Sequence, residues 1–326
     1  MIKVLTQGLF TTVQDTRGRQ GAQYLGFPPS GAMDLLALTA GNVLVGNAPD
    51  EAGIEYALNA PKLQFEDDAV IAVTGVPMHV FLDEEEQPMW QALAVKKGQT
   101  LRLTQASSLG QWGYVSVAGG IDVPAYLGSK ATFTFCGVGG FEGRQLRPGD
   151  RLAVGQPQQD AQPGFRVKRQ HIPLLTSPMV IELMEGYYGD FLTEGDVERI
   201  FSSDWKVLNN SNRTGYRISG PHIEFSDKAR NTSKEAGSDP SNIFDTGYPA
   251  YSLNMCGDTS IILTTEAVCA GGYFCPYCVP LGAQWKVGQA RIGSNIRFRL
   301  IDMDEAARLR DTLDCFAHPE SYFYTK

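Results

Sequence analysis

Short runs of β-branched and aromatic residues, separated by glycine and small polar residues, constrain this chain most. The runs VIAVTGV (70–76), TLRLTQ (100–105) and WGYVSVAGG (112–120) have the composition and the stops that are typical of strands. The chain also has 35 glycines and 18 prolines, which supply the turns that many short strands need. We therefore predict that the first half, residues 1–154, is rich in β-structure.

One segment of this half has a helical period instead. In SGAMDLLALTAGNVLVGN (30–47), apolar residues recur at intervals of three and four. Ser30 is a suitable N-cap, and Gly46 followed by Asn47 is a suitable end. The pattern predicts a helix near 30–46, with Asp34 in its first turn, where a carboxylate is favourable.

The segment GQPQQDAQPGFRVKRQHIP (155–173) is polar, contains proline and glycine and has no period, so we interpret it as a linker. The second half, 174–326, begins with the strand-like MVIELMEG (179–186). The segment LTEGDVERIFSSD (192–204) predicts a helix, and further strand-like runs follow it.

The end of the chain, DEAARLRDTLDCFAHPE (304–320), predicts a terminal helix in which Ala307, Leu309 and Leu313 face the body of the protein. The whole pattern indicates a mostly β fold with a few helices, a β-rich α+β protein with two halves.

Charge and hydropathy exclude several classes of protein. A net charge of −8 argues against a nucleic-acid-binding surface, which needs clustered Lys and Arg. The N-terminal segment lacks the apolar region of a signal peptide, and no stretch approaches the ~18 apolar residues of a membrane span. We expect a cytoplasmic protein without nucleic-acid or membrane partners, and its six cysteines are expected to be thiols.

Three of the cysteines lie in VCAGGYFCPYCVPLG (268–282). A redox dithiol needs a helix directly after its first cysteine, and Pro280 and Gly282 oppose one. A zinc site would need Cys256 beside Cys269, Cys275 and Cys278, but the sequence has no second C-x-x-C pair. We predict buried thiols and no metal site, with metal binding by these four cysteines as the alternative.

Other catalytic motifs are absent from the sequence. It has no G-x-S-x-G nucleophile motif and no G-x-x-x-x-G-K-[ST] phosphate loop. No catalytic residue is therefore assigned.

Hydrogen-bonding residues are instead concentrated in one region near the start of the chain. Capping and turn closure account for several of them, but the variety of groups suggests a substrate site. Its candidate residues are Gln14, Asp15, Arg19, Ser30, Asp34, Asn42, Asn47 and Glu55. Arg19 and Arg213 are candidates for holding a carboxylate, because a guanidinium grips a carboxylate with two hydrogen bonds.

The same region carries a family resemblance. TTVQDTRGRQG, SGAMDLLALTAGNVLVGN, VSVAGGIDVPAYLGS, GVGGFEGRQLRPGDRL and SNRTGYRISGP resemble the KipA / allophanate hydrolase subunit 2 family. This biotin-dependent carboxyltransferase-like family includes the C-type subunit of 5-oxoprolinase and part of the carboxyltransferase domain of urea carboxylase. The resemblance covers nearly the whole chain and implies two β-barrel-like halves, the second (174–326) a cyclophilin-like β-barrel.

The resemblance also implies partners and an activity. The partners are a KipI-like (allophanate hydrolase subunit 1) protein and, in 5-oxoprolinase, a LamB/YcsF-type subunit, with a small amide as substrate. The implied activity is that of a 5-oxoprolinase-type subunit in a complex that opens 5-oxoproline to glutamate with ATP. The alternatives are a carboxyltransferase component that moves a carboxyl group from carboxybiotin to a urea-like amide, and a non-catalytic KipA-like protein that binds a KipI-like kinase inhibitor.

No cofactor is expected to be bound covalently. No lysine lies in an A-M-K-M-like context, so biotin would arrive on a partner, and ATP would act at the level of the complex.

The second half departs from the family pattern. Where the family has a glutamine, a proline and an aspartate, this chain has Ser252, Asn254 and Glu266, and Val268 replaces a second glutamine. A Thr-Thr-Gly-Gly-Tyr turn is reduced to Gly271, Gly272 and Tyr273. Together with Arg213 and Glu266, these three residues complete the predicted substrate site. Because a valine cannot replace the hydrogen bonds of a glutamine, we expect an altered activity.

Overall fold

The computed structural model describes residues 1–232, 234–257 and 259–326 and divides into two units. Unit 1 comprises residues 1–22, 29–174 and 313–326, and unit 2 comprises residues 23–28 and 175–312. The expected β-rich α+β fold is confirmed: unit 1 contains open sheets, and unit 2 contains a closed barrel.

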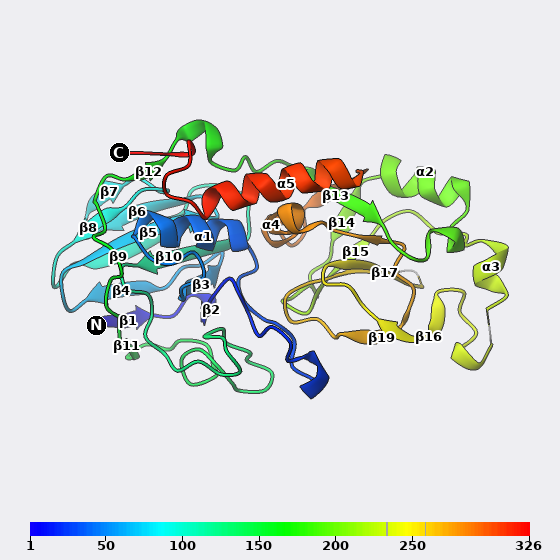
Figure 1. Ribbon diagram of the computed structural model, residues 1–326, viewed down its shortest axis with the longest axis horizontal. Helices are drawn as coiled ribbons and strands as arrows, with labels where there is room; N and C mark the ends of the chain where they lie inside the picture. Colours follow the sequence, from blue (N-terminus) through cyan, green and yellow to red (C-terminus); the bar gives the residue numbers. More distant parts are fainter. Residues whose placement is uncertain (233, 258) are drawn as a thin grey trace. The chain divides into compact units, whose positions relative to one another are not determined.

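Unit 1 is a β-sandwich with one helix on its outside (Figure 1). One sheet has the order β11-β1-β4-β9-β6-β7, and the other has the order β2-β3-β10-β5-β8. The strands and the helix of the two layers are β1 (Ile2–Thr6), β2 (Leu9–Gln14), α1 (Leu35–Leu44), β3 (Gly53–Ala57), β4 (Lys62–Phe65), β5 (Ala69–Gly75), β6 (Met78–Leu82), β7 (Glu85–Gln87), β8 (Leu93–Val95), β9 (Thr100–Gln105), β10 (Trp112–Val117) and β11 (Arg151–Leu152). A further ribbon pairs β12 (Arg166–Val167) with β22 (Tyr324–Thr325), next to the short 3-10 helix Arg169–His171.

The burial pattern of each strand follows its place in these layers. Every residue of β10 is buried, because this central strand has the sandwich core on one face and α1 on the other. The edge-side strand β6 alternates between buried and exposed positions, and His79 is one of its exposed residues. The core itself is apolar and contains side chains from both sheets, such as Val4, Phe65 and Val115.

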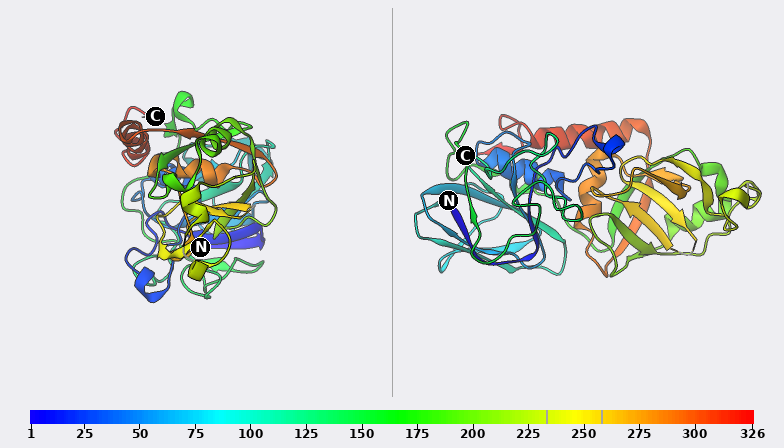
Figure 2. Two further views of the ribbon diagram at one scale, coloured as in Figure 1. Left: turned by 90° about the vertical axis from the view of Figure 1, so that its right-hand side faces the viewer. Right: turned by 90° about the horizontal axis from the view of Figure 1, so that it is seen from below.

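Unit 2 is built around the closed barrel β13-β20-β17-β18-β15-β14-β21 (Figure 2). A separate two-stranded ribbon pairs β16 with β19. The strands and helices of the unit are β13 (Met179–Glu185), α2 (Glu194–Ser202), β14 (Trp205–Val207), β15 (Gly215–Ser219), α3 (Asp227–Arg230), β16 (Asn242–Gly247), β17 (Ser252–Cys256), β18 (Thr259–Leu263), β19 (Ala270–Tyr273), β20 (Tyr277–Cys278), α4 (Gln284–Gln289), β21 (Asn295–Leu300) and the start of α5 (Met303–Phe316). Short 3-10 helices occur at Gln23–Leu25, Gly189–Phe191, Lys234–Ala236 and Leu281–Ala283.

Two details of the predicted helices are wrong. Ser30 is not the N-cap of α1, because its φ of 58° lies in the left-handed region. The cap is Asp34, whose carboxylate accepts a hydrogen bond from the Ala37 N–H at 2.9 Å. In α5, Leu313 is buried and Leu309 is half-buried as expected, but Ala307 is exposed. Within the described residues, no helix has the length and apolar content needed to cross a membrane.

Helix α1 approaches its sheet closely at Gly41. A Cβ atom at this position would lie 2.6 Å from Ser116 Oγ on β10. The Ser116 hydroxyl is buried and has no hydrogen-bond partner among the described residues. The close packing of α1 on the sheet therefore depends on the absence of a side chain at Gly41.

Gly41→Ala is expected to lower the free energy of unfolding. Overpacking costs about 1–3 kcal/mol, which exceeds the ~1 kcal/mol that alanine contributes over glycine in a helix. Adding Ser116→Ala removes the atom that clashes, so the double variant should recover most of the loss. Chemical denaturation measures all three variants, and purely additive effects would show that this contact is not the cause.

In unit 2, Asp196 holds the start of α2. Its carboxylate accepts hydrogen bonds from the backbone N–H groups of Thr193, Glu224 and Phe225, the Thr193 hydroxyl and the Arg199 guanidinium at 2.7–3.1 Å. Burial raises the pKa of Asp196, but the hydrogen bonds outweigh burial and hold the pKa below its usual range. Because the pKa is lowered on folding, this stabilisation is present above the unfolded-state pKa of about 4 and is lost as the pH falls through the folded-state value.

Asp196→Asn should therefore destabilise the protein by about 2–4 kcal/mol at pH 7, since the charged acceptor is lost from a buried network. The difference from the unsubstituted protein should begin to shrink below about pH 4, where the unfolded chain binds a proton at Asp196, and should continue to shrink as the pH falls toward the lower folded-state pKa. Glu198→Gln, on the exposed side of the same helix, is the matched control and should be neutral. Denaturation curves from pH 3 to 7 test this, and a difference that does not depend on pH would contradict it.

Candidate functional site

The start of α1 is held by a buried carboxylate from β3. Glu55 Oε2 accepts hydrogen bonds from the Met33 N–H at 2.8 Å and from the Tyr114 hydroxyl at 2.7 Å. The same hydroxyl accepts a bond from the Asp34 N–H at 2.7 Å. Burial, together with the negative charges of Glu55 and Asp34, raises the pKa of Tyr114 well above its usual value. Two of the predicted site residues, Asp34 and Glu55, thus anchor the helix to the sheet.

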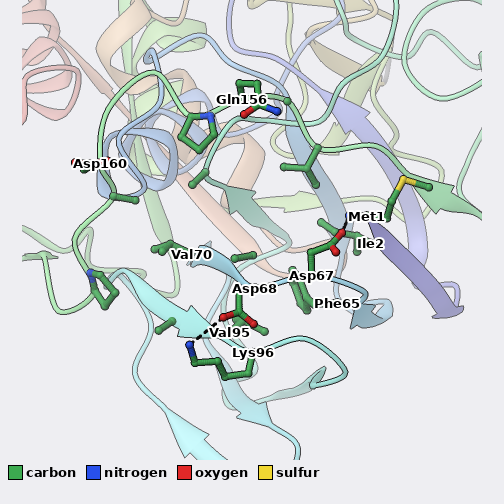
Figure 3. Close-up of a pocket in the computed structure, with 18 of the residues that line it drawn as sticks. Met1, Ile2, Phe65, Asp67, Asp68, Val70, Val95, Lys96, Gln156 and Asp160 are labelled. Carbon is green, nitrogen blue, oxygen red and sulfur yellow. Dashed lines mark hydrogen bonds and ion pairs between the residues drawn. The ribbon is translucent and has the colours of Figure 1, made fainter.

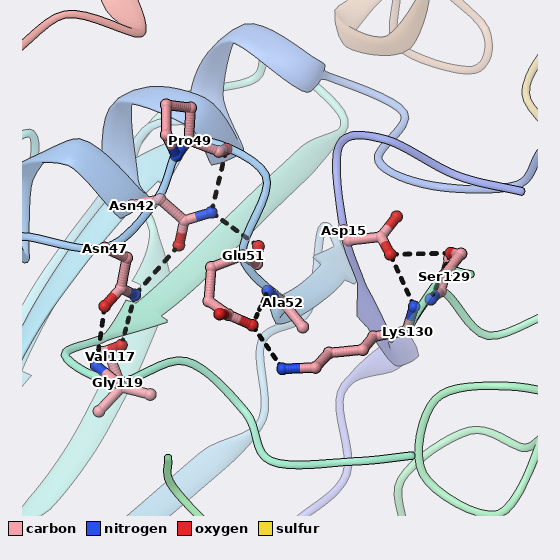
Figure 4. A network of polar contacts seen from close by, with 11 residues as sticks. Asp15, Asn42, Asn47, Pro49, Glu51, Ala52, Val117, Gly119, Ser129 and Lys130 are labelled. Carbon is pink, nitrogen blue, oxygen red and sulfur yellow. Dashed lines mark hydrogen bonds and ion pairs between the residues drawn. The ribbon is translucent and has the colours of Figure 1, made fainter. Parts of the chain in front are cut away.

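Asp15 joins two loops of unit 1 (Figure 4). Its Oδ1 accepts the Gly18 N–H at 2.8 Å, and its Oδ2 accepts the Ser129 hydroxyl at 2.8 Å and the Lys130 N–H at 2.7 Å. The Lys130 ammonium then pairs with Glu51 at 2.6 Å. The predicted residue Asp15 therefore also holds the scaffold together.

The two predicted asparagines hold the segment after α1 (Figure 4). The Asn42 amide donates to the Glu51 carbonyl at 2.7 Å. The Asn47 amide donates to the Val117 carbonyl at 2.7 Å, and its oxygen accepts the Gly119 N–H at 2.7 Å. Both asparagine side chains therefore make hydrogen bonds within the fold.

The remaining predicted residues of unit 1 are Gln14, Ser30 and Arg19, and the first two each have a buried polar atom without a hydrogen-bond partner among the described residues. Gln14 is fully buried and donates to Thr12 Oγ1 at 2.9 Å and to the Thr132 carbonyl at 3.1 Å, but its Oε1 has no partner within the described chain. The Ser30 hydroxyl is likewise buried, and no described residue bonds to it. Arg19 is buried, donates to the Ala131 carbonyl and lies 5.8 Å from the centre of the Tyr126 ring.

In unit 2, Arg213 and Glu266 form a buried ion pair. Arg213 Nε lies 2.7 Å from Glu266 Oε1, and neither side chain is more than 10% exposed. The Glu266 N–H also donates to the Arg213 carbonyl at 2.9 Å, which joins the start of β15 to the end of β18. The guanidinium that we expected to hold a substrate carboxylate thus holds a carboxylate of the protein.

The residues Gly271, Gly272 and Tyr273 lie in the ribbon strand β19. A Cβ atom on Gly271 would lie 2.9 Å from the ring of Tyr248, and the Tyr248 hydroxyl accepts the Tyr273 N–H at 2.7 Å. The glycine therefore makes room for Tyr248, and the Tyr273 side chain is 42% exposed. Two of the residues that depart from the family pattern also satisfy each other, because the buried Ser252 hydroxyl donates to Asn254 Oδ1 at 2.8 Å.

The structure places the predicted residues of the first half in unit 1 and those of the second half in unit 2. Sequence reasoning missed Tyr114, Lys130, Glu51 and Tyr248. Each of them meets its partner across a long sequence separation, and no local pattern marks such a contact.

The C-P-Y-C cysteines lie in and before β20. Cys275 is buried and Cys278 is half-buried, and burial raises the pKa of both thiols. Burial also raises the pKa of Cys256 to about 12. These shifts oppose the thiolate form that redox and metal chemistry needs. Among the described residues, no three His, Cys, Asp or Glu side chains are grouped so as to hold a metal ion.

The larger of two described pockets, about 680 Å³, lies in unit 1 (Figure 3). Apolar residues such as Phe65 and Val95 line it, and two ion pairs, Met1–Asp67 at 2.8 Å and Lys96–Asp68 at 3.0 Å, lie at it. None of the predicted site residues lines this pocket.

Comparison with known proteins places the chain in a family. Residues 25–300 match the model described as carboxyltransferase domain, subdomain A and B. Urea amidolyase of Saccharomyces cerevisiae is 36% identical over 96% of the chain, and the C-type subunit of 5-oxoprolinase from Escherichia coli K12 is 32% identical over 95% of the chain and 94% of that protein. The crystal structure of Kluyveromyces lactis urea carboxylase is 33% identical, with a TM-score of 0.91, over 100% of the chain and 30% of that protein.

The chain spans only 17% of the length of the yeast urea amidolyase. The matches nevertheless extend over almost all of this sequence and confirm the resemblance found in its motifs. The chain belongs to the carboxyltransferase domain, subdomain A and B, family, related to the C-type subunit of 5-oxoprolinase and to the carboxyltransferase region of urea amidolyase.

Proposed function

We propose that the chain is a carboxyltransferase component that acts on a small, neutral, urea-like amide. The observation that carries this proposal is the agreement with urea carboxylase over the entire chain, at a TM-score of 0.91. Urea amidolyase, at 36% identity, supports the same assignment.

The polarity of the predicted site residues also favours a neutral substrate. Glu266 neutralises Arg213 within 2.7 Å, so a substrate carboxylate would have to compete with a buried carboxylate of the protein. Two of the predicted residues, Gln14 and Ser30, keep a buried atom with hydrogen-bonding capacity, and both atoms, Gln14 Oε1 and the Ser30 hydroxyl, are neutral. An unsatisfied buried polar atom costs about 1–3 kcal/mol, and a bound amide would relieve that cost.

Each of these atoms suits one part of an amide. Gln14 Oε1 is an acceptor for an amide N–H, and the Ser30 hydroxyl is a donor for the amide oxygen. Loss of the amide N–H proton would place negative charge on the amide oxygen, and a donor at that oxygen would stabilise the anion that attacks the carboxyl carbon. The bond between that carbon and the biotin nitrogen would break as the new bond forms, and the ureido group of biotin would take up the proton. Carboxybiotin, delivered by another protein, would supply the carboxyl group, and the KipI-like subunit 1 protein would complete the site.

A 5-oxoprolinase role is the second candidate. The match to the 5-oxoprolinase protein of Escherichia coli covers 94% of its length, and 5-oxoproline contains a cyclic amide with the same N–H and carbonyl groups. In this case the chain would act with the subunit 1 protein and a LamB/YcsF-type subunit, and ATP would be consumed by the complex.

Reconstitution separates the two candidates. The chain purified with its subunit 1 partner is expected to transfer labelled carboxyl from a carboxylated biotin carrier to urea. It should not stimulate 5-oxoproline-dependent ATP hydrolysis when the third subunit is added. ATP hydrolysis with 5-oxoproline and no transfer to urea would reverse the assignment. Absence of both activities would refute both candidate functions.

Removing the Ser30 hydroxyl should lower kcat/KM for the amide substrate by about tenfold or more, which corresponds to the loss of one transition-state hydrogen bond. Both Ser30→Ala and Ser30→Gly remove the hydroxyl, and glycine tolerates the positive φ of this position. A fall in Ser30→Ala alone would indicate backbone strain instead. Ser116→Ala, which removes another buried hydroxyl without a described partner, is the matched control and should keep full activity.

A further inference from the structure

The smaller described pocket, about 280 Å³, lies in unit 2, and none of the residues proposed above to bind the amide lines it. Glu185 at the end of β13 and Tyr277 and Cys278 of β20 line it, together with Tyr187 and Pro249. The two strands are directly paired there, with Glu185 opposite Tyr277 and Met184 opposite Cys278. Part of the pocket wall is therefore formed by paired barrel strands, which hold side chains in a fixed position for a ligand.

The Glu185 carboxylate carries a negative charge that the fold does not neutralise. Within the described part of unit 2, no Lys or Arg pairs with it and no hydrogen-bond donor reaches it, and the residue is exposed. Other carboxylates of the unit, such as Glu182, Asp196 and Glu266, each have a cationic partner. Glu185 thus lies at a pocket with its charge available to a ligand.

The aromatic side chains of the pocket complement this charge. Tyr277 is only 3% exposed, yet its hydroxyl donates to no group among the residues described. Tyr187 is 89% exposed, so its ring is accessible to a ligand. Burial and the nearby negative charge of Glu185 raise the pKa of Tyr277 to about 12, so the phenol stays protonated.

The remaining wall is apolar and polarisable. Cys275 and Cys278 are present as neutral thiols, because burial raises the pKa of each, and Pro249 adds an apolar surface. An aromatic face, a carboxylate and a polarisable wall are the combination that recognises an organic ammonium group, through cation–π attraction and an ion pair.

We propose that this pocket is a binding site for a small organic cation, an ammonium group carried on a compact apolar or aromatic body. The ammonium lies between the Glu185 carboxylate and the tyrosine rings, and the apolar body packs against Pro249 and the two thiols. This inference does not depend on the proposed carboxyl transfer.

Benzylammonium and its neutral analogue benzyl alcohol are suitable probes, because they have the same ring and nearly the same size. Calorimetric titration of the full chain should show benzylammonium binding at least about tenfold more tightly, which corresponds to about 1.4 kcal/mol. Equal affinity for the two probes, or binding of neither, would overturn the proposal.

Glu185→Gln should weaken benzylammonium binding by about tenfold and leave benzyl alcohol unaffected, since only the charge is removed. Glu198→Gln, an exposed carboxylate of the same unit outside the pocket, is the matched control and should change neither affinity. Both positions are exposed, so neither substitution should disturb folding. An unchanged affinity in Glu185→Gln would contradict the assignment.

Thiol labelling locates the bound probe. Benzylammonium should slow maleimide labelling of Cys278, measured peptide by peptide with mass spectrometry. The exposed Cys136 and Cys269 lie outside the pocket and should label at unchanged rates. Protection of all three thiols, or of none, would show that the probe binds elsewhere.

Discussion

The buried carboxylate of Glu55 is the contact on which the arrangement of unit 1 depends. Glu55 lies on β3. Its carboxylate accepts a hydrogen bond from the Tyr114 hydroxyl on β10 and another from the Met33 N–H in the segment that leads into α1. A buried carboxylate is costly unless hydrogen bonds replace its water, and these donors supply them. The position at which α1 begins is therefore determined by the sheet, and the loops fixed by Asp15, Asn42 and Asn47 follow from it.

Helices of unit 2 are also attached to β-structure through a buried carboxylate. The Glu182 carboxylate on β13 accepts hydrogen bonds from the Lys286 ammonium at 2.7 and 2.8 Å and from the Arg299 guanidinium at 3.1 Å. Arg299 also forms an ion pair with Glu305 of α5. Two helices are thus attached to the outside of the barrel through one carboxylate, while Asp196 holds α2. In both units, helices attach to β-structure through a carboxylate whose charge is satisfied by several donors.

The sequence predicted the fold well where periodicity was clear. The strands at 70–76, 100–105 and 112–120 and the helix within 30–47 occur as β5, β9, β10 and α1. It failed where a backbone dihedral angle decided the outcome: Ser30 has the composition of an N-cap but lies at positive φ, so Asp34 takes the cap. It also could not pair Arg213 with Glu266 or Tyr248 with Tyr273, because only the closed barrel and its ribbon bring these residues together.

The candidate site shows why residue type alone does not identify function. Asp, Glu and Asn drew attention in the sequence as polar groups that suit catalysis or binding, yet Asp15, Asn42, Asn47 and Glu55 make the hydrogen bonds that the fold requires. Gln14 and Ser30 were predicted on the same grounds, but each keeps a buried polar atom unsatisfied among the described residues. A fold accepts that cost only where something offsets it, and a bound ligand is one such compensation. Among the residues that the sequence singles out, the distinction between scaffold and candidate site thus depends on which polar atoms the fold leaves unsatisfied.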